Sequence, residues 1–187
     1  MNALVDRIDS ALAMTTALVD GIGSDQLAAP SLCAGWDVRT ELNHLVGGMR
    51  IFTAALGGLR AGADHDADWL GDDPRHAFLE AAAADRAAWR RPGALDTTVH
   101  ISLGALPGPM AAVVHLTEVL VHGVDLAVAT GQRRHIDQQQ CADLLATMHD
   151  MGGMDPYRRP GMFGPERAAP AEATAHQELL AYLGRAT

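Results

Sequence analysis

The sequence has 187 residues, of which 48% are hydrophobic and 20% charged, as is usual for a globular protein large enough to bury its own core. The net charge is −9, and the fourteen basic residues, all arginines, form no cluster, which excludes the basic surface of a typical nucleic-acid-binding protein. Two cysteines are too few for a disulfide framework. Charges at Asp6 and Arg7 interrupt any signal-peptide core, and no apolar run approaches the roughly 20 residues of a membrane span. We therefore expect a cytoplasmic protein without membrane contact.

Three amphipathic helices are predicted in the first half of the chain, because apolar residues recur there every three to four positions. Asp37 is an expected N-cap of the second helix. Gly47 and Gly48 lie inside that helix, at a cost of about 1 kcal/mol per glycine relative to alanine, which indicates that another helix packs closely there. The three helices span residues 2–22, 37–57 and 74–90.

The second half begins with residues 96–106, whose alternating pattern predicts a short extended segment or hairpin. Residues 109–129 are the most apolar stretch and predict a central, mostly buried helix. A further helix, an irregular Gly- and Pro-rich loop and a terminal helix follow at residues 137–151, 152–169 and 171–183. We therefore expect a single all-α domain over residues 1–187, a four-helix bundle with an added hairpin and C-terminal helix.

Four ionisable residues interrupt the apolar helix at 109–129. His115, Glu118, His122 and Asp125 fall on one stripe about 80° wide, given the helical period. A buried carboxylate without a partner is costly, so this stripe must meet a cation, a hydrogen-bond network or a metal. Glu118 and His122 are four residues apart, and their side chains can converge on one ion.

His44 is the natural third ligand, since it lies mid-helix among apolar positions. Two histidines and a glutamate are a common catalytic zinc set that leaves a fourth position open, although nickel, iron and manganese also accept such donors. Another interpretation stays open: a lone mid-helix histidine is more often a satisfied core residue, and Glu118 with His122 would also suit an exposed pair.

Two further residues of the stripe are candidate catalytic groups. His115 is seven residues, about 10.5 Å, from His122, so it is expected to line the pocket rather than bind the same ion. Asp125 could orient the His122 imidazole or make an ordinary hydrogen bond between helices. Cys33 lies just before the second helix, whose positive end favours a thiolate, but it is expected to be a packed loop thiol.

Two motifs resemble those of a known family. The segment PSLCAGWDVRTELNHLVGG at residues 30–48 is similar to the start of the actinobacterial mycothiol-dependent maleylpyruvate isomerase N-terminal domain family, within the DinB-like group of metal-binding four-helix bundles. The segment LTEVLVHGVDLAVATGQ at residues 116–132 resembles its second motif, and FGPE at residues 163–166 resembles one subgroup. The resemblance covers nearly the whole chain and implies a DinB-like bundle.

The resemblance also implies a metal and a cosubstrate. In that family the histidine of the Asn-His-Leu motif and the two residues of the Glu-x-x-x-His motif bind a divalent metal, zinc in the isomerase; they match His44, Glu118 and His122. A low-molecular-weight thiol such as mycothiol is the implied cosubstrate. The full isomerase has a second, C-terminal domain that contributes to its active site, whereas this sequence ends soon after the predicted bundle, so we expect a reaction other than maleylpyruvate isomerisation.

Three functions follow from these observations. The first is a thiol-dependent transferase or isomerase whose metal lowers the pKa of a thiol that attacks a small electrophile, with His115 moving a proton or positioning substrate. The second is a metal-dependent hydrolase that activates water, with Asp125 or His115 as general base. The third is a non-enzymatic metal-binding bundle. A homodimer would suit a bundle of this size, but the sequence indicates no interface.

Overall fold

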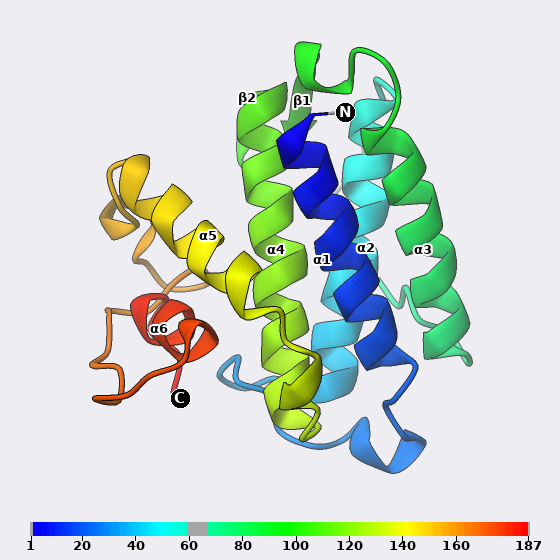
Figure 1. The fold of residues 1–187 in the computed structure, drawn as a ribbon. Coiled ribbons are helices and arrows are strands. Elements are labelled where there is room, and N and C mark those ends of the chain that lie inside the picture. The colour runs from blue at the N-terminus through cyan, green and yellow to red at the C-terminus, as the bar shows by residue number, and fades with distance from the viewer. Residues whose placement is uncertain (1, 60–66, 187) are drawn as a thin grey trace.

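The computed structural model describes residues 2–59 and 67–186. The Gly- and Asp-rich residues 58–71 predict a loop between the second and third helices, and part of this stretch lies outside the described residues. Four long helices lie side by side and form a bundle (Figure 1). The prediction of an all-α bundle is confirmed. The four helices are α1 (Ala3–Val19), α2 (Val38–Leu56), α3 (Pro74–Trp89) and α4 (Gly108–Ala129).

Side-chain caps fix where the bundle helices begin. Asp37 has extended backbone angles and accepts a hydrogen bond from the Thr40 backbone N–H at 2.7 Å, as predicted for the N-cap of α2. Asp73 caps α3 in the same way, and Pro74 takes the first helical position, where a missing N–H costs nothing. The Asp37 cap also fixes the position of Trp36, Glu41 and His44, which lie beside or within the first turns of α2.

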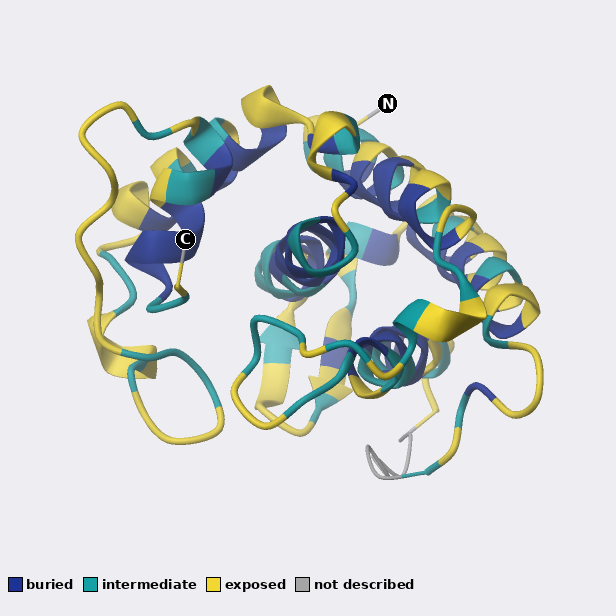
Figure 2. Cartoon of the chain, turned by 90° about the horizontal axis from the view of Figure 1, so that it is seen from below, coloured by how far each residue is buried: buried dark blue, intermediate teal, exposed yellow. Residues whose placement is uncertain are grey.

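Helix α4 is the central element of the bundle, with most of its residues buried, as the sequence predicted. Figure 2 shows the buried residues of the bundle helices on the faces turned toward one another. Within the described residues α4 is the one helix long and apolar enough to cross a membrane, contrary to the expectation that no stretch approaches that length. However, 78% of its most apolar window is buried inside the protein, as in the core helix of a bundle.

The glycine pair of α2 does not serve the close helix contact that we predicted. A Cβ atom added to Gly47 would lie 2.8 Å from the indole ring of Trp69, a residue of the α2–α3 connection, whereas Gly48 faces open space. The close contact between helices occurs elsewhere: a Cβ atom on Gly123 of α4 would lie 2.4 Å from Oγ1 of Thr15 on α1. The small residue that lets two bundle helices approach is therefore Gly123.

A two-stranded antiparallel hairpin covers one end of the bundle, as predicted for the extended segment. Its strands are β1 (Thr98–Ile101) and β2 (Gly104–Pro107), with Val99 paired to Leu106. Val99 is fully buried against the bundle, while its neighbours point outward. Helix α4 begins directly after β2, and Gly108 passes so close to the backbone of Leu95 that no side chain would fit.

Helices α5 (Gln138–Asp150) and α6 (Ala175–Tyr182) pack against each other beside α4 (Figure 1). The final helix is shorter than the predicted 171–183, because Thr174 and Gln177 form a capping box that sets its start. After α6, Gly184 adopts a left-handed conformation with φ of +83°. The Arg185 N–H then bonds back to the Leu180 carbonyl at 2.9 Å. This turn sends the Arg185 side chain back toward the bundle.

Candidate metal centre

The three predicted metal ligands lie together where α2 and α4 face each other. Nε2 of His44 lies 3.0 Å from Oε2 of Glu118, and Nε2 of His122 lies 3.5 Å from the same oxygen. All three donor atoms lie within 4.8 Å of one another. Zinc–nitrogen and zinc–oxygen bonds of ordinary length in a tetrahedron separate the two donors by about 3.3 Å, so this set fits a zinc ion.

The site is open on one side and closed on the other. The side chains of His44 and Glu118 retain 26% and 37% of their exposure, whereas His122 retains 10%. A metal held by these donors would thus have three protein ligands and one side facing solvent. This is the arrangement of catalytic zinc sites, whereas structural sites surround the ion with four protein ligands.

The donors strongly influence one another's protonation. Burial alone would raise the pKa of Glu118, but hydrogen bonds and positive charge from His122 and His44 outweigh it and hold the pKa below its ordinary value. Burial alone would lower the pKa of His122, but contacts with Cys33, Glu118 and Glu41 raise it well above its ordinary value. The site is therefore built to hold positive charge beside a carboxylate.

Glu41 orients the imidazole of His122. Its Oε1 lies 2.8 Å from Nδ1 of His122, and its side chain is fully buried. A carboxylate on the far nitrogen fixes the tautomer and direction of a metal-binding histidine, so that Nε2 of His122 faces the other two donors. Glu41 is not among the residues predicted from the sequence, although it lies on the buried face of α2, one turn before His44. A carboxylate at a core-facing position was the signal that could have revealed it.

Asp125 lies near His122 but has another main partner. Its Oδ2 is 3.7 Å from Nδ1 of His122 and 2.7 Å from Nε of Arg185, which reaches it from beyond α6. Burial raises the pKa of Asp125, and the positive charge of Arg185 opposes that effect. The carboxylate that directly orients His122 is therefore Glu41, and Asp125 joins the C-terminal segment to α4.

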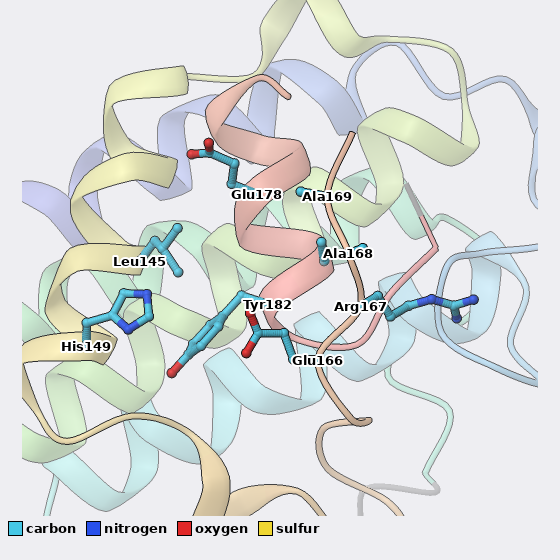
Figure 3. Close-up of a pocket in the computed structure, with 9 residues that line it drawn as sticks. Leu145, His149, Glu166, Arg167, Ala168, Ala169, Glu178 and Tyr182 are labelled. Carbon is cyan, nitrogen blue, oxygen red and sulfur yellow. The ribbon is translucent and has the colours of Figure 1, made fainter. Parts of the chain in front are cut away.

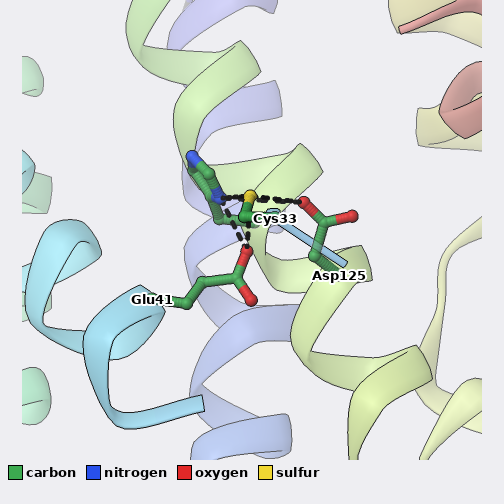
Figure 4. Close-up of side chains that lie close together, drawn as sticks. Cys33, Glu41 and Asp125 are labelled. Atoms are coloured by element: carbon green, nitrogen blue, oxygen red, sulfur yellow. Dashed lines mark hydrogen bonds and ion pairs between the residues drawn. The ribbon is translucent and has the colours of Figure 1, made fainter. Parts of the chain in front are cut away.

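Cys33 lies between these groups, as Figure 4 shows. Its Sγ is 3.6 Å from Oε1 of Glu41, 3.8 Å from Nδ1 of His122 and 3.7 Å from Oδ2 of Asp125. Burial raises the pKa of this thiol more than the contact with His122 lowers it. Cys33 is a packed loop thiol, as expected, but its neighbours are charged groups of the site rather than apolar side chains.

Trp36 forms an aromatic wall beside the donors. Its ring centre is 5.0 Å from that of His44 and 6.0 Å from that of His122, with which it is nearly parallel. The loop that carries it is closed by a bridge between Pro30 and Asp37 just before α2. Trp36 thus belongs to this loop and also lines the site.

His115 lies on α4 about two turns before His122, away from the three donors. Its Nε2 is 2.7 Å from Oδ2 of Asp85 on α3, and both side chains are almost completely buried. The rings of Phe52 and Trp89 pack against the imidazole, with ring centres at 4.5 Å and 5.5 Å. The structure therefore does not bring His115 together with His44, and a role of His115 in the reaction stays a prediction.

A surface hollow near the C-terminus is separate from these groups. It lies between α5, α6 and the segment before α6, and Figure 3 shows His149 and Tyr182 at its rim with their rings close together. None of its lining residues belongs to the donor set or contacts it through the side-chain interactions described above. It contributes nothing to the candidate metal centre.

Comparison with known proteins agrees with the two motifs. The chain is 31% identical over 170 residues to uncharacterized proteins from two strains of Mycobacterium tuberculosis, an alignment that covers 90% of each chain. It resembles the crystal structure of the mycothiol-dependent maleylpyruvate isomerase with a TM-score of 0.55 and 17% identity, over 81% of this chain and 73% of that one. At that identity the likeness concerns the fold.

The profile of the mycothiol maleylpyruvate isomerase N-terminal domain family matches residues 8–127. This range includes α1 to α4 almost completely, and with them His44, Glu118 and His122. The matched part is well over half of the sequence. The chain therefore belongs to the mycothiol maleylpyruvate isomerase N-terminal domain family.

Proposed function

We propose that this protein is a metal-dependent enzyme that joins a small-molecule thiol, mycothiol in the first instance, to an electrophilic substrate or isomerises the substrate through such an adduct. The family match supports a mycothiol-linked activity. The observation that carries the proposal is the geometry of the donors: His44, Glu118 and His122 converge from two helices and leave one side toward solvent.

A divalent metal, zinc by the chemistry of the donors, would be held by these three side chains, and it would supply the Lewis acidity that lowers the pKa of a thiol. Residues of the chain would orient the ligands and contact the substrate. Glu41 holds His122 in the tautomer that presents Nε2, and Trp36 offers an aromatic face beside His44 for a substrate. The negative charge of Glu118 keeps the donor set close to neutral once the ion and the thiolate are both present.

Two neighbouring contacts favour thiol chemistry over hydrolysis. A hydrolase needs a general base that reaches the attacking water, and Asp125 and His115 were the candidates. Asp125 is bound to Arg185 and His115 to Asp85, and all four side chains are at most 10% exposed. A thiol, with an ordinary pKa of about 8.5, loses its proton after a much smaller shift than water, and so depends less on such a base. The partial exposure of His44 and Glu118 likewise favours an enzyme over a binding protein with a closed metal site.

The first experiment measures metal content and thiol conjugation together. Protein purified with added zinc should hold the ion, and should consume mycothiol in the presence of an electrophile such as a chlorinated nitrobenzene. His44→Ala should lose the conjugation activity and bind less zinc than the wild type, while His149→Ala, a change at the separate surface hollow, should keep both properties. A wild-type protein that takes up no divalent metal, or that binds metal without any mycothiol-dependent reaction across a panel of electrophiles, would contradict the proposal.

A further inference from the structure

A second group of donor atoms lies behind His122. Whereas Nε2 of His122 faces His44 and Glu118, its Nδ1 faces Cys33, Glu41 and Asp125. Sγ of Cys33, one oxygen of each carboxylate and Nδ1 of His122 all lie within 4.8 Å of one another. We call these four residues the inner donor set and the three predicted ligands the outer donor set.

The distances within the inner donor set match those between zinc ligands. Bonds of ordinary length in a tetrahedron place sulfur about 3.6 Å from nitrogen and about 3.5 Å from oxygen. The Sγ atom of Cys33 lies 3.8 Å from Nδ1 of His122, and 3.6 Å and 3.7 Å from the oxygens of Glu41 and Asp125. The distances from Nδ1 of His122 to these oxygens are 2.8 Å and 3.7 Å, on either side of the expected value of about 3.3 Å, and the two oxygens lie within 4.8 Å of each other.

Each carboxylate of this set has one oxygen without a hydrogen-bond partner in the described part of the chain. These oxygens are Oε2 of Glu41 and Oδ1 of Asp125, and both side chains are fully buried. Two fully buried carboxylates this close together require a positive charge. Two cationic side chains lie beside them: the imidazole of His122, 2.8 Å from Glu41, and the guanidinium of Arg185, 2.7 Å from Asp125 and 3.7 Å from the sulfur of Cys33.

The geometry points to a second divalent-cation site at Cys33, Glu41, His122 and Asp125, in which the guanidinium of Arg185 takes the place of the ion when none is bound. The ligand is a borderline-soft cation such as Zn²⁺ or Co²⁺, since the set combines thiolate, imidazole and carboxylate. On binding, the cation replaces the thiol proton of Cys33 and the proton between His122 and Glu41, and both protons go to solvent. Arg185 lies beyond α6, so its side chain can leave Asp125 without breaking a helix.

This site goes beyond the proposed function, which needs only the outer donor set. Because Arg185 competes for Asp125, the inner site should bind more weakly than the outer one. With both sites filled, His122 would have lost both ring protons and would be an imidazolate, with one nitrogen toward each donor set. Occupation of the inner site would remove the hydrogen bond from His122 to Glu41 and would thus alter the outer site.

A cobalt titration in the absence of added thiol tests the inference. A Co²⁺ ion on a cysteine sulfur gives a strong near-ultraviolet charge-transfer band, which nitrogen and oxygen donors do not give. At excess Co²⁺ the wild-type protein should bind two ions, and the band should grow only with the second. Cys33→Ser should abolish the band. Cys141→Ser, at the other, buried cysteine, should leave it unchanged.

Arg185→Met removes the competing charge while keeping most of the side-chain volume, and should tighten the second binding step by about tenfold or more. In His44→Ala, which damages only the outer set, the band should persist, so failure of the proposed function and failure of this inference can be told apart. Absence of the band in both the wild type and Arg185→Met, or its persistence in Cys33→Ser, would overturn the inference.

Discussion

Helix α4 carries two histidines that differ more in their surroundings than in their chemistry. His122 and His115 lie on the same stripe, and each pairs with a buried carboxylate from a neighbouring helix, Glu41 at 2.8 Å and Asp85 at 2.7 Å. The opposite nitrogen of His122 faces further donors and solvent, whereas the His115 ring is enclosed by Phe52 and Trp89. A histidine–carboxylate pair can thus prepare a ligand or fasten two helices, according to what lies beyond it.

The first and largest expected effect is on metal binding. In the Cys33→Ser background, where the inner donor set lacks its sulfur, Glu118→Ala removes the oxygen that both histidines share, so the protein should lose stoichiometric zinc, as measured by metal analysis after dialysis. The matched control is Glu80→Ala, because Glu80 forms an exposed pair with His76 at the same four-residue spacing. Zinc retained by Glu118→Ala in that background would show that the outer donor set does not hold the ion.

The second prediction concerns the enclosed pair. Asp85→Ala leaves the imidazole of His115 buried without its partner, which should lower the free energy of unfolding by about 3–5 kcal/mol in denaturant titrations. Zinc affinity of the folded protein should be unchanged. The exposed Asp143 provides the control, and Asp143→Ala should change stability by no more than about 0.5 kcal/mol. A loss of zinc affinity in Asp85→Ala would show that the two histidines are not independent.

The third prediction concerns the orienting carboxylate. Glu41→Gln keeps the shape of the side chain but weakens its hold on Nδ1 of His122, so zinc affinity should fall by about 10- to 100-fold in competition with a chelator. Exposed Glu178→Gln, on α6, is the matched control. An unchanged affinity in Glu41→Gln would mean that His122 is held in place by the helix alone.

The fourth and smallest effect is the pH dependence of the metal-free protein. The pKa of His122 lies above its ordinary value in the folded state because Cys33, Glu118 and Glu41 favour the imidazolium. The resulting stability is fully present below the unfolded pKa, about 6.5, and is lost as pH rises through the folded pKa. With chelator present, the free energy of unfolding should decline above about pH 6.5 in the wild type, and this decline should be smaller in His122→Gln. Identical curves would contradict the proposed environment of His122.

The outer donor set could be predicted because it depends on local pattern. Spacing along α4 placed Glu118 and His122 on one side, apolar neighbours indicated that both helices were buried, and the family motifs indicated His44. The fold followed from periodicity and caps in the same way. Where the prediction of the terminal helix was too long, a capping box at Thr174 was the overlooked local signal.

The inner donor set could not be predicted, because it depends on tertiary contacts over long sequence distances. Arg185 reaches Asp125 from 60 residues away, after a turn at Gly184, and Cys33 comes from a loop whose path has no periodicity to read. The Asp85 partner of His115 was equally out of reach, since it lies on another helix in an alanine-rich stretch. Side-chain pairs between separate elements are set by packing, which no single segment encodes.

The measurement that tests the central claim most directly is the visible spectrum of cobalt-loaded protein during a mycothiol titration. Cys33→Ser is the best background, because the inner donor set then contributes no sulfur of its own. If His44, Glu118 and His122 hold a metal that accepts a thiol, mycothiol should shift the visible bands and add a sulfur-to-cobalt band that saturates at one thiol per chain. A spectrum that stays unchanged at saturating mycothiol, with cobalt still bound, would contradict the account.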